Sequence, residues 1–404
     1  MAVGNVRFPE MKQIAGISLG TSNAGIKQTE RDDVLVIQMA EGSSCAGVFT
    51  QNAFCAAPVH IARQHLQSSP RWLLINSGNA NAGTGKQGML DGMRCCDALA
   101  SVVKGSAEHV LPFSTGVIGE ILPVAKIEQA LPAAVSNLKE QNWSNASQAI
   151  MTTDTFAKGA SITIDIEGET VTLTGISKGA GMIQPNMATM LGFVATDAKI
   201  SQALLQKCLA GAAEQSFNRI TVDGDTSTND ACILMASGCS SAPEIIEDSE
   251  NYKVFANAVM DICKKLAELI VRDGEGATKL MRIHVEQALD NNEAVLVGKT
   301  IAHSPLVKTA FFASDPNWGR ILAAVGRAGV ENMDLDKIEI YLDDICIVKN
   351  GGRAESYTEE QGQQVMNQEE IQIRVVLGRG EVKQEVLTCD LSYDYVRINA
   401  EYRT

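Results

Sequence analysis

The chain has 404 residues, of which 45% are hydrophobic, and this is enough for one large layered domain or two domains. Its formal net charge of −14 argues against nucleic-acid binding, because that function needs a surface rich in lysine and arginine to displace counterions. No apolar run approaches the roughly 18 residues of a membrane span, and residues 1–20 lack the apolar core of a signal peptide. We therefore expect a cytoplasmic protein that does not enter a membrane.

The first half of the chain contains short strand-like segments. Residues 34–39 and 72–76 are continuous apolar runs typical of buried strands. Further along, isoleucines alternate with polar residues over 162–166, and Val171 and Leu173 continue the alternation after the turn residues 167–169. This spacing predicts a β-hairpin.

The second half begins with two predicted helices. Ser201 is placed to cap a helix over residues 201–212, and residues 251–272 repeat apolar side chains at helical spacing until Asp273 and Gly274 stop the pattern. Segments rich in β-branched residues then predict strands at 338–347, 371–377 and 385–398. The mixture of strands and helices indicates a layered α/β fold without fixing the strand order.

Residues 175–192 fit neither periodicity, although they are apolar and rich in glycine and methionine. A stretch of this kind inside a compact domain is usually a functional loop. It contains Thr189, whose hydroxyl is a weak nucleophile unless a base lies beside it. An N-terminal threonine can carry that base in its own α-amine, which would require cutting the Ala188–Thr189 bond. Threonine itself can make that cut by attacking the preceding carbonyl, which gives an ester that water then hydrolyses.

The run KGAGMIQPNMATMLGFVATDA, residues 178–198, strongly resembles the cleavage segment of the ornithine acetyltransferase family, also called glutamate N-acetyltransferase. Further segments resemble the same family in the same order along nearly the whole chain. They are SGNAN (77–81), STGVIG (114–119), MTTDT (151–155), VDGDTSTND (222–230), DGEGATK (273–279), SDPNWGR (314–320) and the terminus at 395–404.

The resemblance implies roles for individual residues. Thr189 matches the family nucleophile, and the bond between Ala188 and Thr189 matches the one that is cut. Thr115 and Gly116 match the oxyanion pair. A hydroxyl and a backbone N–H aimed at one point can hold the negative oxygen of a tetrahedral intermediate.

The substrate-binding positions of the family match Lys178, Glu275, Asn399, Thr404 and one of the two threonines Thr152 and Thr153. The substrate N-acetylornithine carries an α-carboxylate, for which Lys178 is a suitable partner, and a side-chain ammonium, for which Glu275 is suitable. The two pairings can also be reversed or shared.

The resemblance also implies an architecture. The family fold is a layered α-β-β-α-like sandwich, reminiscent of N-terminal nucleophile hydrolases but with a different topology, plus a smaller C-terminal α/β region. The active site lies between the larger N-terminal and the smaller C-terminal domain. Cleavage gives an α chain of residues 1–188 and a β chain of residues 189–404, and two such pairs form an α2β2 assembly.

The implied reaction is a ping-pong transfer of acetyl from N-acetylornithine to glutamate, and bifunctional members also take acetyl from acetyl-CoA. One alternative is a related self-cleaving aminopeptidase or amidohydrolase that passes the acyl group to water. A second is a binding protein that keeps the fold without the chemistry.

We expect no metal and no cofactor. The ten cysteines form no C-x-x-C pair, Asp223–Asp230 has Thr228 where a calcium loop needs glycine, and Gly83 is followed by Thr84 where a phosphate loop needs lysine.

Overall fold

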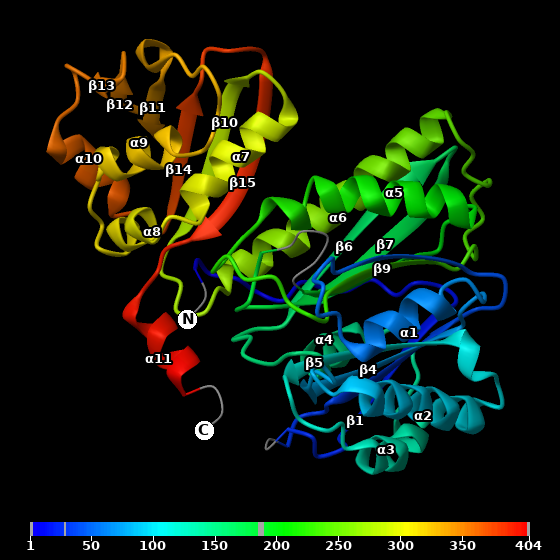
Figure 1. The fold of residues 1–404 in the computed structure, drawn as a ribbon. Coiled ribbons are helices and arrows are strands. Elements are labelled where there is room, and N and C mark those ends of the chain that lie inside the picture. Colours follow the sequence, from blue (N-terminus) through cyan, green and yellow to red (C-terminus); the bar gives the residue numbers. More distant parts are fainter. Residues whose placement is uncertain (1–2, 28–29, 185–189, 402–404) are drawn as a thin grey trace. The chain divides into compact units, whose positions relative to one another are not determined.

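The computed structural model describes residues 3–27, 30–184 and 190–401. These residues form two compact units. The larger unit contains the described residues of 7–218 and 225–270, and the smaller contains those of 1–6, 219–224 and 271–404. The boundary between the units therefore does not follow the predicted cleavage point. Figure 1 shows the order of the elements along the chain.

The first sheet of the larger unit has the strand order β1-β2-β4-β5. Its strands are β1 (Ile17–Ser22), β2 (Val34–Met39), β4 (Trp72–Asn79) and β5 (Val110–Val117). β4 and β5 run parallel, so their carboxyl ends meet at the same edge of the sheet. The strands predicted at 34–39 and 72–76 are confirmed, and the second continues to Asn79.

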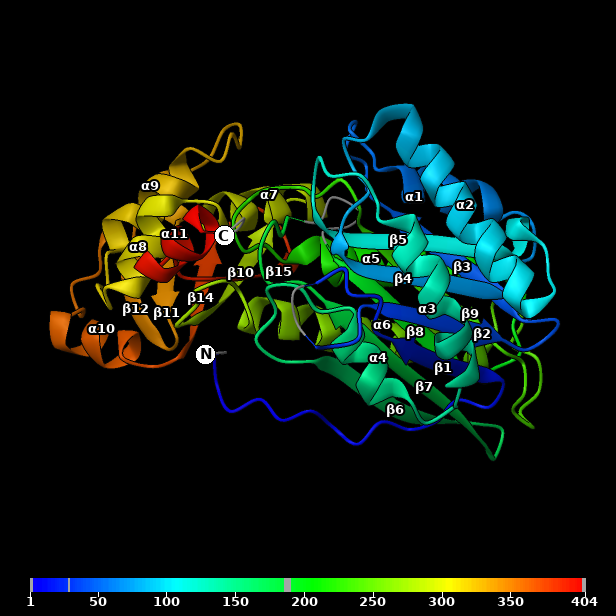
Figure 2. The same cartoon turned by 90° about the horizontal axis from the view of Figure 1, so that it is seen from below.

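The second sheet of the larger unit has the order β3-β9-β8-β7-β6. Its strands are β3 (Ser44–Phe49), β6 (Lys158–Ile166), β7 (Glu169–Lys178), β8 (Leu191–Thr196) and β9 (Ala231–Ala236). β6 and β7 form the predicted hairpin, which runs along the edge of this sheet in the view of Figure 2. The hairpin prediction is confirmed.

Helices cover the outer faces of both sheets, while the inner faces share one apolar core. The helices of this unit are α1 (Ala57–His65), α2 (Gly85–Val103), α3 (Val124–Ser136), α4 (Trp143–Ala149), α5 (Gln202–Glu214) and α6 (Glu250–Arg272), whose last two residues belong to the smaller unit. Phe113 of the first sheet and Phe193 of the second meet edge to face, with ring centroids 5.3 Å apart. α2 and α3 pack on the first sheet, and α5 packs on the second. Figure 1 shows these layers, and the expected α-β-β-α sandwich is confirmed.

The two predicted helices of the second half are also confirmed. α5 begins after Ser201, whose hydroxyl accepts a hydrogen bond from the Leu204 N–H at 3.4 Å. α6 ends at Arg272, next to the predicted stop at Asp273 and Gly274. Leu266 of α6 lies against Gly175 of β7, where an added Cβ would be 3.1 Å from the leucine Cδ1. Helix α6 thus covers the second sheet beside α5.

The smaller unit is built on a six-stranded sheet of order β13-β12-β11-β14-β10-β15. Its strands are β10 (Leu280–Ala288), β11 (Glu339–Leu342), β12 (Ile345–Lys349), β13 (Gly352–Arg353), β14 (Glu370–Val376) and β15 (Val382–Cys389). Its helices are α7 (Asn291–Ala302), α8 (Pro305–Phe312), α9 (Trp318–Gly326), α10 (Glu359–Met366) and α11 (Tyr393–Ala400). α7, α8, α9 and α10 share one buried core with the sheet. The expected smaller α/β region is confirmed.

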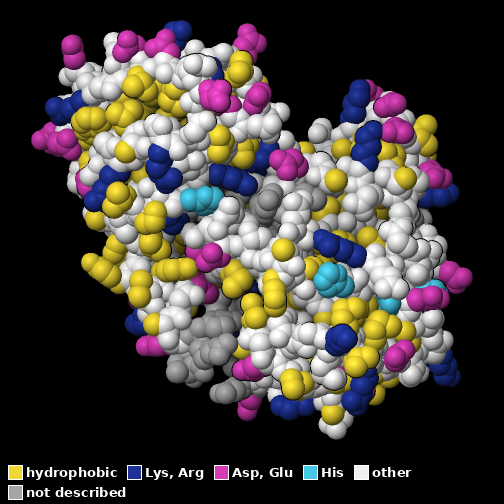
Figure 3. Space-filling model, in the orientation of Figure 1, with side chains coloured by type: hydrophobic (Ala, Val, Ile, Leu, Met, Phe, Trp, Pro, Cys, Tyr) yellow, Lys and Arg dark blue, Asp and Glu magenta, His cyan; other side chains and the backbone are white. Residues whose placement is uncertain are grey.

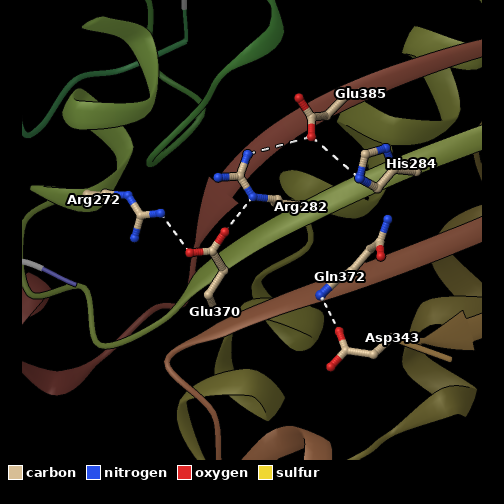
Figure 4. Close-up of polar contacts among 7 residues, drawn as sticks. All are labelled: Arg272, Arg282, His284, Asp343, Glu370, Gln372 and Glu385. Atoms are coloured by element: carbon tan, nitrogen blue, oxygen red, sulfur yellow. Dashed lines mark hydrogen bonds and ion pairs between the residues drawn. The ribbon is translucent and has the colours of Figure 1, made fainter. Parts of the chain in front are cut away.

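The other face of this sheet carries a ladder of charges (Figure 4). Glu370 on β14 accepts hydrogen bonds from Arg272 and from Arg282 on β10, each at 2.6 Å. Glu385 on β15 lies 3.6 Å from Arg282 and 3.4 Å from His284. Burial lowers the pKa of His284 despite the nearby Glu385 carboxylate. The charges along this face therefore offset one another across neighbouring strands.

Three sequence-based boundaries are corrected. Residues 338–347 form two strands, β11 and β12, because the chain turns at Asp343, where φ is +48°. The predicted strand at 385–398 ends at Cys389, and residues 393–400 form α11 instead. The predicted loop at 175–192 is shorter, because β7 extends to Lys178 and β8 begins at Leu191, and these two residues pair.

Within the described ranges, no helix is both long and apolar enough to cross a membrane, and no cluster of three or more His, Cys, Asp or Glu side chains is arranged to hold a metal ion. On the face drawn in Figure 3, basic and acidic side chains are intermingled over both units.

Candidate active site

The predicted site residues fall into three groups. Thr115, Gly116, Thr152, Thr153 and Lys178 lie in the larger unit. Glu275 and Asn399 lie in the smaller unit. Ala188, Thr189 and Thr404 lie outside the described residues. Each unit thus carries part of the predicted site, and the nucleophile and the cleavage point stay predictions.

The predicted oxyanion pair lies at the carboxyl end of β5, beside the end of β4. Thr115 pairs with Ser77, and Gly116 with Gly78. Gly116 has φ of +133°, and a Cβ added there would lie 2.3 Å from the carbonyl carbon of Gly78 and 2.6 Å from the nitrogen of Asn79. Position 116 therefore requires glycine, both for its backbone conformation and because two backbones approach each other closely.

A network of polar side chains holds this strand end. The Asn229 amide donates to the carbonyl oxygen of Ala80 at 2.5 Å and to that of Ser114 at 3.0 Å. The Ser114 hydroxyl donates to Asn76 at 2.6 Å, and the Asn76 amide donates to the Asn79 carbonyl at 2.8 Å. Thr115 follows Ser114 directly, so the network fixes the backbone from which the predicted oxyanion donors project.

Replacing Asn229 with alanine is expected to lower the free energy of unfolding by about 2–3 kcal/mol, because two buried carbonyl oxygens lose their donor. Urea unfolding measures this loss. The matched control is Asn52→Ala, which removes a part-buried hydrogen bond to the Thr226 carbonyl and an exposed one from the Phe54 N–H, and it is expected to cost about 1 kcal/mol because water can replace the exposed partner. An equal loss in the two variants would contradict the role of Asn229.

Lys178 is the last residue of β7, and only 9% of its surface is exposed. The backbone N–H of the next residue, Gly179, donates to the Asp154 carboxylate at 2.7 Å. The same carboxylate accepts from the backbone N–H of Thr152 at 2.9 Å and from the Lys158 ammonium at 2.6 Å. Asp154 therefore links the predicted substrate turn, Thr152 and Thr153, to the strand end that carries Lys178.

Burial by itself raises the pKa of Asp154, but the charges of Lys158 and Lys178 and the hydrogen bonds from Lys158 and Gly179 outweigh it. The pKa of Asp154 is therefore held well below its usual range, and the carboxylate is ionised at neutral pH. Asp154 is part of the MTTDT motif but was not among the predicted site residues. The signal in the sequence that could have identified Asp154 is its position directly after the two candidate substrate residues Thr152 and Thr153.

In the smaller unit, the structure brings the predicted residues Glu275 and Asn399 together. The Asn399 amide donates to the Glu275 carboxylate at 2.8 Å, although 124 residues separate them. The Ser392 hydroxyl, just before α11, donates to the Gly276 carbonyl at 2.6 Å. α11 is therefore tied to the loop that carries Glu275, as the resemblance required of residues so close to the end of the chain.

The histidines are not part of these groups. The ring of His65 contacts the carbonyl oxygen of Val110, and His284 belongs to the charge ladder of the smaller unit. Burial lowers the pKa of His303 to about 4, with nearby Lys299 and Lys308 adding to the effect. A half-buried His303 that is neutral near pH 7 is poorly placed on the pH scale to act as a general base there.

Known proteins are similar to this chain over nearly its whole length. The ArgJ family profile matches residues 18–404. The arginine biosynthesis bifunctional protein ArgJ of Methylococcus capsulatus is 63% identical over 391 residues, which are 97% of this chain and 96% of the relative. The protein of the same description from Pseudomonas syringae pv. tomato is 56% identical over the full length of both chains.

A crystal structure of arginine biosynthesis bifunctional protein ArgJ from Bacillus halodurans is 42% identical, with a TM-score of 0.51. It covers 53% of this chain and 100% of the solved chain. The chain described here therefore belongs to the ArgJ family, the ornithine acetyltransferases or glutamate N-acetyltransferases of arginine biosynthesis that the sequence motifs indicated.

Proposed function

We propose that this enzyme moves the acetyl group of N-acetylornithine to glutamate through an acetyl ester on Thr189, after cutting its own chain between Ala188 and Thr189. The observation that carries the proposal is the end of β5. There Thr115 and Gly116 sit on a backbone fixed by Asn229, Ser114 and by close approach to β4. Stabilising an oxyanion requires donors held rigidly, and a backbone fixed in this way supports that role for the Thr115 hydroxyl and the Gly116 N–H.

In the first half-reaction the Thr189 hydroxyl adds to the acetamide carbon, and the α-amine of Thr189 takes the hydroxyl proton. Thr115 and Gly116 hold the resulting oxyanion. When the carbon–nitrogen bond breaks, the protonated α-amine of Thr189 gives that proton to the departing nitrogen, and ornithine leaves. The α-amine of glutamate then attacks the acetyl ester, which gives N-acetylglutamate and frees the hydroxyl. In this second half-reaction the same α-amine of Thr189 passes a proton from the attacking amine to the Thr189 oxygen.

Charge supports the assignment of the substrate. Lys178 supplies a nearly buried cation in the larger unit, and Glu275, bonded to Asn399, supplies a nearly buried anion in the smaller unit. We propose that Lys178 binds the α-carboxylate shared by both substrates, and that Glu275 and Asn399 bind the ammonium end of N-acetylornithine. Thr404 and one of Thr152 and Thr153 complete the proposed substrate contacts.

The sheet order supports lasting association of the two products of cleavage. β7 precedes Ala188 and β8 follows Thr189, yet they are hydrogen-bonded neighbours, and β3 pairs with β9 in the same sheet. Separating an α chain of 1–188 from a β chain of 189–404 would thus break two strand pairings. The solved Bacillus relative, which matches along its full length but covers 53% of this chain, is the size expected of one such product. We propose an α2β2 assembly in the cytoplasm.

The reaction is tested by offering the enzyme two acetyl donors, N-acetylornithine and acetyl-CoA, one at a time. Purified enzyme with glutamate is expected to form N-acetylglutamate from N-acetylornithine. The Methylococcus and Pseudomonas relatives are described as bifunctional, which supports acetyl-CoA as a second donor. Mass spectrometry of the products, with each donor offered alone, measures both activities. Release of free acetate from N-acetylornithine without glutamate would instead favour a hydrolase that passes the acyl group to water.

A further inference from the structure

The geometry points to Asp154 as a positioning residue that sets the place of Lys178 relative to the turn of Thr152 and Thr153. This inference rests on the proposed function, in which Lys178 binds the α-carboxylate of the substrate. In this role the buried Asp154 carboxylate holds Lys178, the cation that binds the substrate, and does not touch the substrate itself.

The contacts of Asp154 join its own stretch of chain, residues 152–158, to the end of β7. Its side chain is fully buried, and its two oxygens accept from the Lys158 ammonium, the backbone N–H of Gly179 and the backbone N–H of Thr152. Gly179 directly follows Lys178, so the bond to its N–H pins the last peptide of β7. Because a carboxylate accepts such charge-assisted bonds more strongly than a neutral group, losing the charge would loosen all three contacts together.

The local charges leave Lys178 available for a ligand. Lys158 is fully buried, pairs with Asp154 and lies 4.8 Å from the centre of the Phe156 ring. One buried carboxylate thus faces two ammonium groups, and the cluster keeps an excess positive charge. Lys27 also lies near, since its ammonium donates to the Met151 carbonyl at 3.2 Å, but the Asp33 carboxylate acts on it more strongly than Asp154 does and offsets its charge. A surplus of positive charge beside the turn is suited to a substrate carboxylate.

The Asp154–Lys158 ion pair also has a structural role in the fold, and this role must be separated from the positioning of Lys178. A buried ion pair stabilises little in itself, but removing one partner strands the other charge and is strongly destabilising. Asp154→Asn alone would therefore confuse loss of folding with loss of positioning. Lys158→Met removes that cation in advance. Asp154 then keeps the hydrogen bonds from Gly179 and Thr152 and the nearby charge of Lys178, and urea unfolding of this parent measures what the lost ion pair costs.

The experiment is a double-mutant cycle in the Lys158→Met enzyme, with Asp154→Asn and Lys178→Met made singly and together. Each variant is checked for cleavage on a denaturing gel, and rates are normalised to the cleaved fraction. For N-acetylornithine with glutamate, Asp154→Asn is expected to lower kcat/KM by ~10-fold or more, mainly by raising KM. In the enzyme that already lacks Lys178, the same change is expected to have less than a ~3-fold effect, because the two residues act as one unit.

Additive effects of the two substitutions would overturn the inference, since they would mean that Asp154 acts without Lys178. In the same Lys158→Met enzyme, Asp154→Glu keeps the negative charge and is expected to raise KM less than Asp154→Asn does. Equal effects of these two variants would also overturn it. An unaltered enzyme that transfers no acetyl group contradicts the proposed function, whereas an active Lys158→Met enzyme with an additive cycle contradicts only the role of Asp154.

Discussion

Replacing Thr189 with alanine is expected to leave a single uncut chain of 43.2 kDa and to abolish acetyl transfer. Alanine has no hydroxyl to attack the Ala188 carbonyl, so neither the cut nor the acetyl ester can form. The loss of kcat is expected to be ~10⁴-fold or more, as for other enzymes that lose their nucleophile. A denaturing gel and the acetyl-transfer assay measure the two effects in the same preparation.

The matched control is Thr189→Ser, which keeps a hydroxyl on the same carbon and is expected to give two bands of about half the mass, with part of the activity. Normal processing of the alanine variant would rule out Thr189 as the attacking group. A single band from the unaltered protein would contradict self-cleavage altogether and would favour a binding protein that keeps the fold without the chemistry.

Local patterns predicted the elements that carry strong periodicity. The helix at 251–272 and the hairpin at 162–175 were recognisable because their apolar faces repeat over many residues and end at turn residues. The end of the chain was misassigned. Val396 and Ile398 continue the β-branched residues that predicted a strand over 385–398, yet residues 393–400 form a helix that the contact of Asn399 with the distant Glu275 ties down.

The site residues came from the family resemblance, but their connections required the structure. No pattern in the sequence places Asn399 on Glu275 or the Gly179 N–H on Asp154, because these pairs join segments 124 and 25 residues apart. Asn229 was inside a motif with no assigned role until its amide was seen to join Ala80 to Ser114. A motif preserves the residues of a site, whereas only the folded backbone gives their distances.

The second large effect is expected at Gly116. Alanine there would place its Cβ 2.3 Å from the Gly78 carbonyl carbon, a contact that neither backbone can relieve without moving. Its φ of +133° is also closed to residues with a Cβ. The ends of β4 and β5 must then separate, and the Gly116 N–H leaves its position. We expect kcat to fall ~10²–10³-fold, as on loss of one oxyanion donor.

Gly119→Ala is the control for Gly116→Ala, because it tests the backbone strain of a positive φ without a steric clash. Gly119 also has a positive φ, +86°, but a Cβ added there meets nothing within 4 Å. This control is expected to lose about 1 kcal/mol of unfolding free energy and to keep kcat near that of the unaltered enzyme. Steady-state kinetics measure kcat, and urea unfolding measures the free energy of unfolding, for both the Gly116→Ala and the Gly119→Ala variants. If Gly116→Ala kept the kcat of the control, the close approach of β4 and β5 would not set the geometry of the reaction, and the oxyanion donors would have to be sought elsewhere.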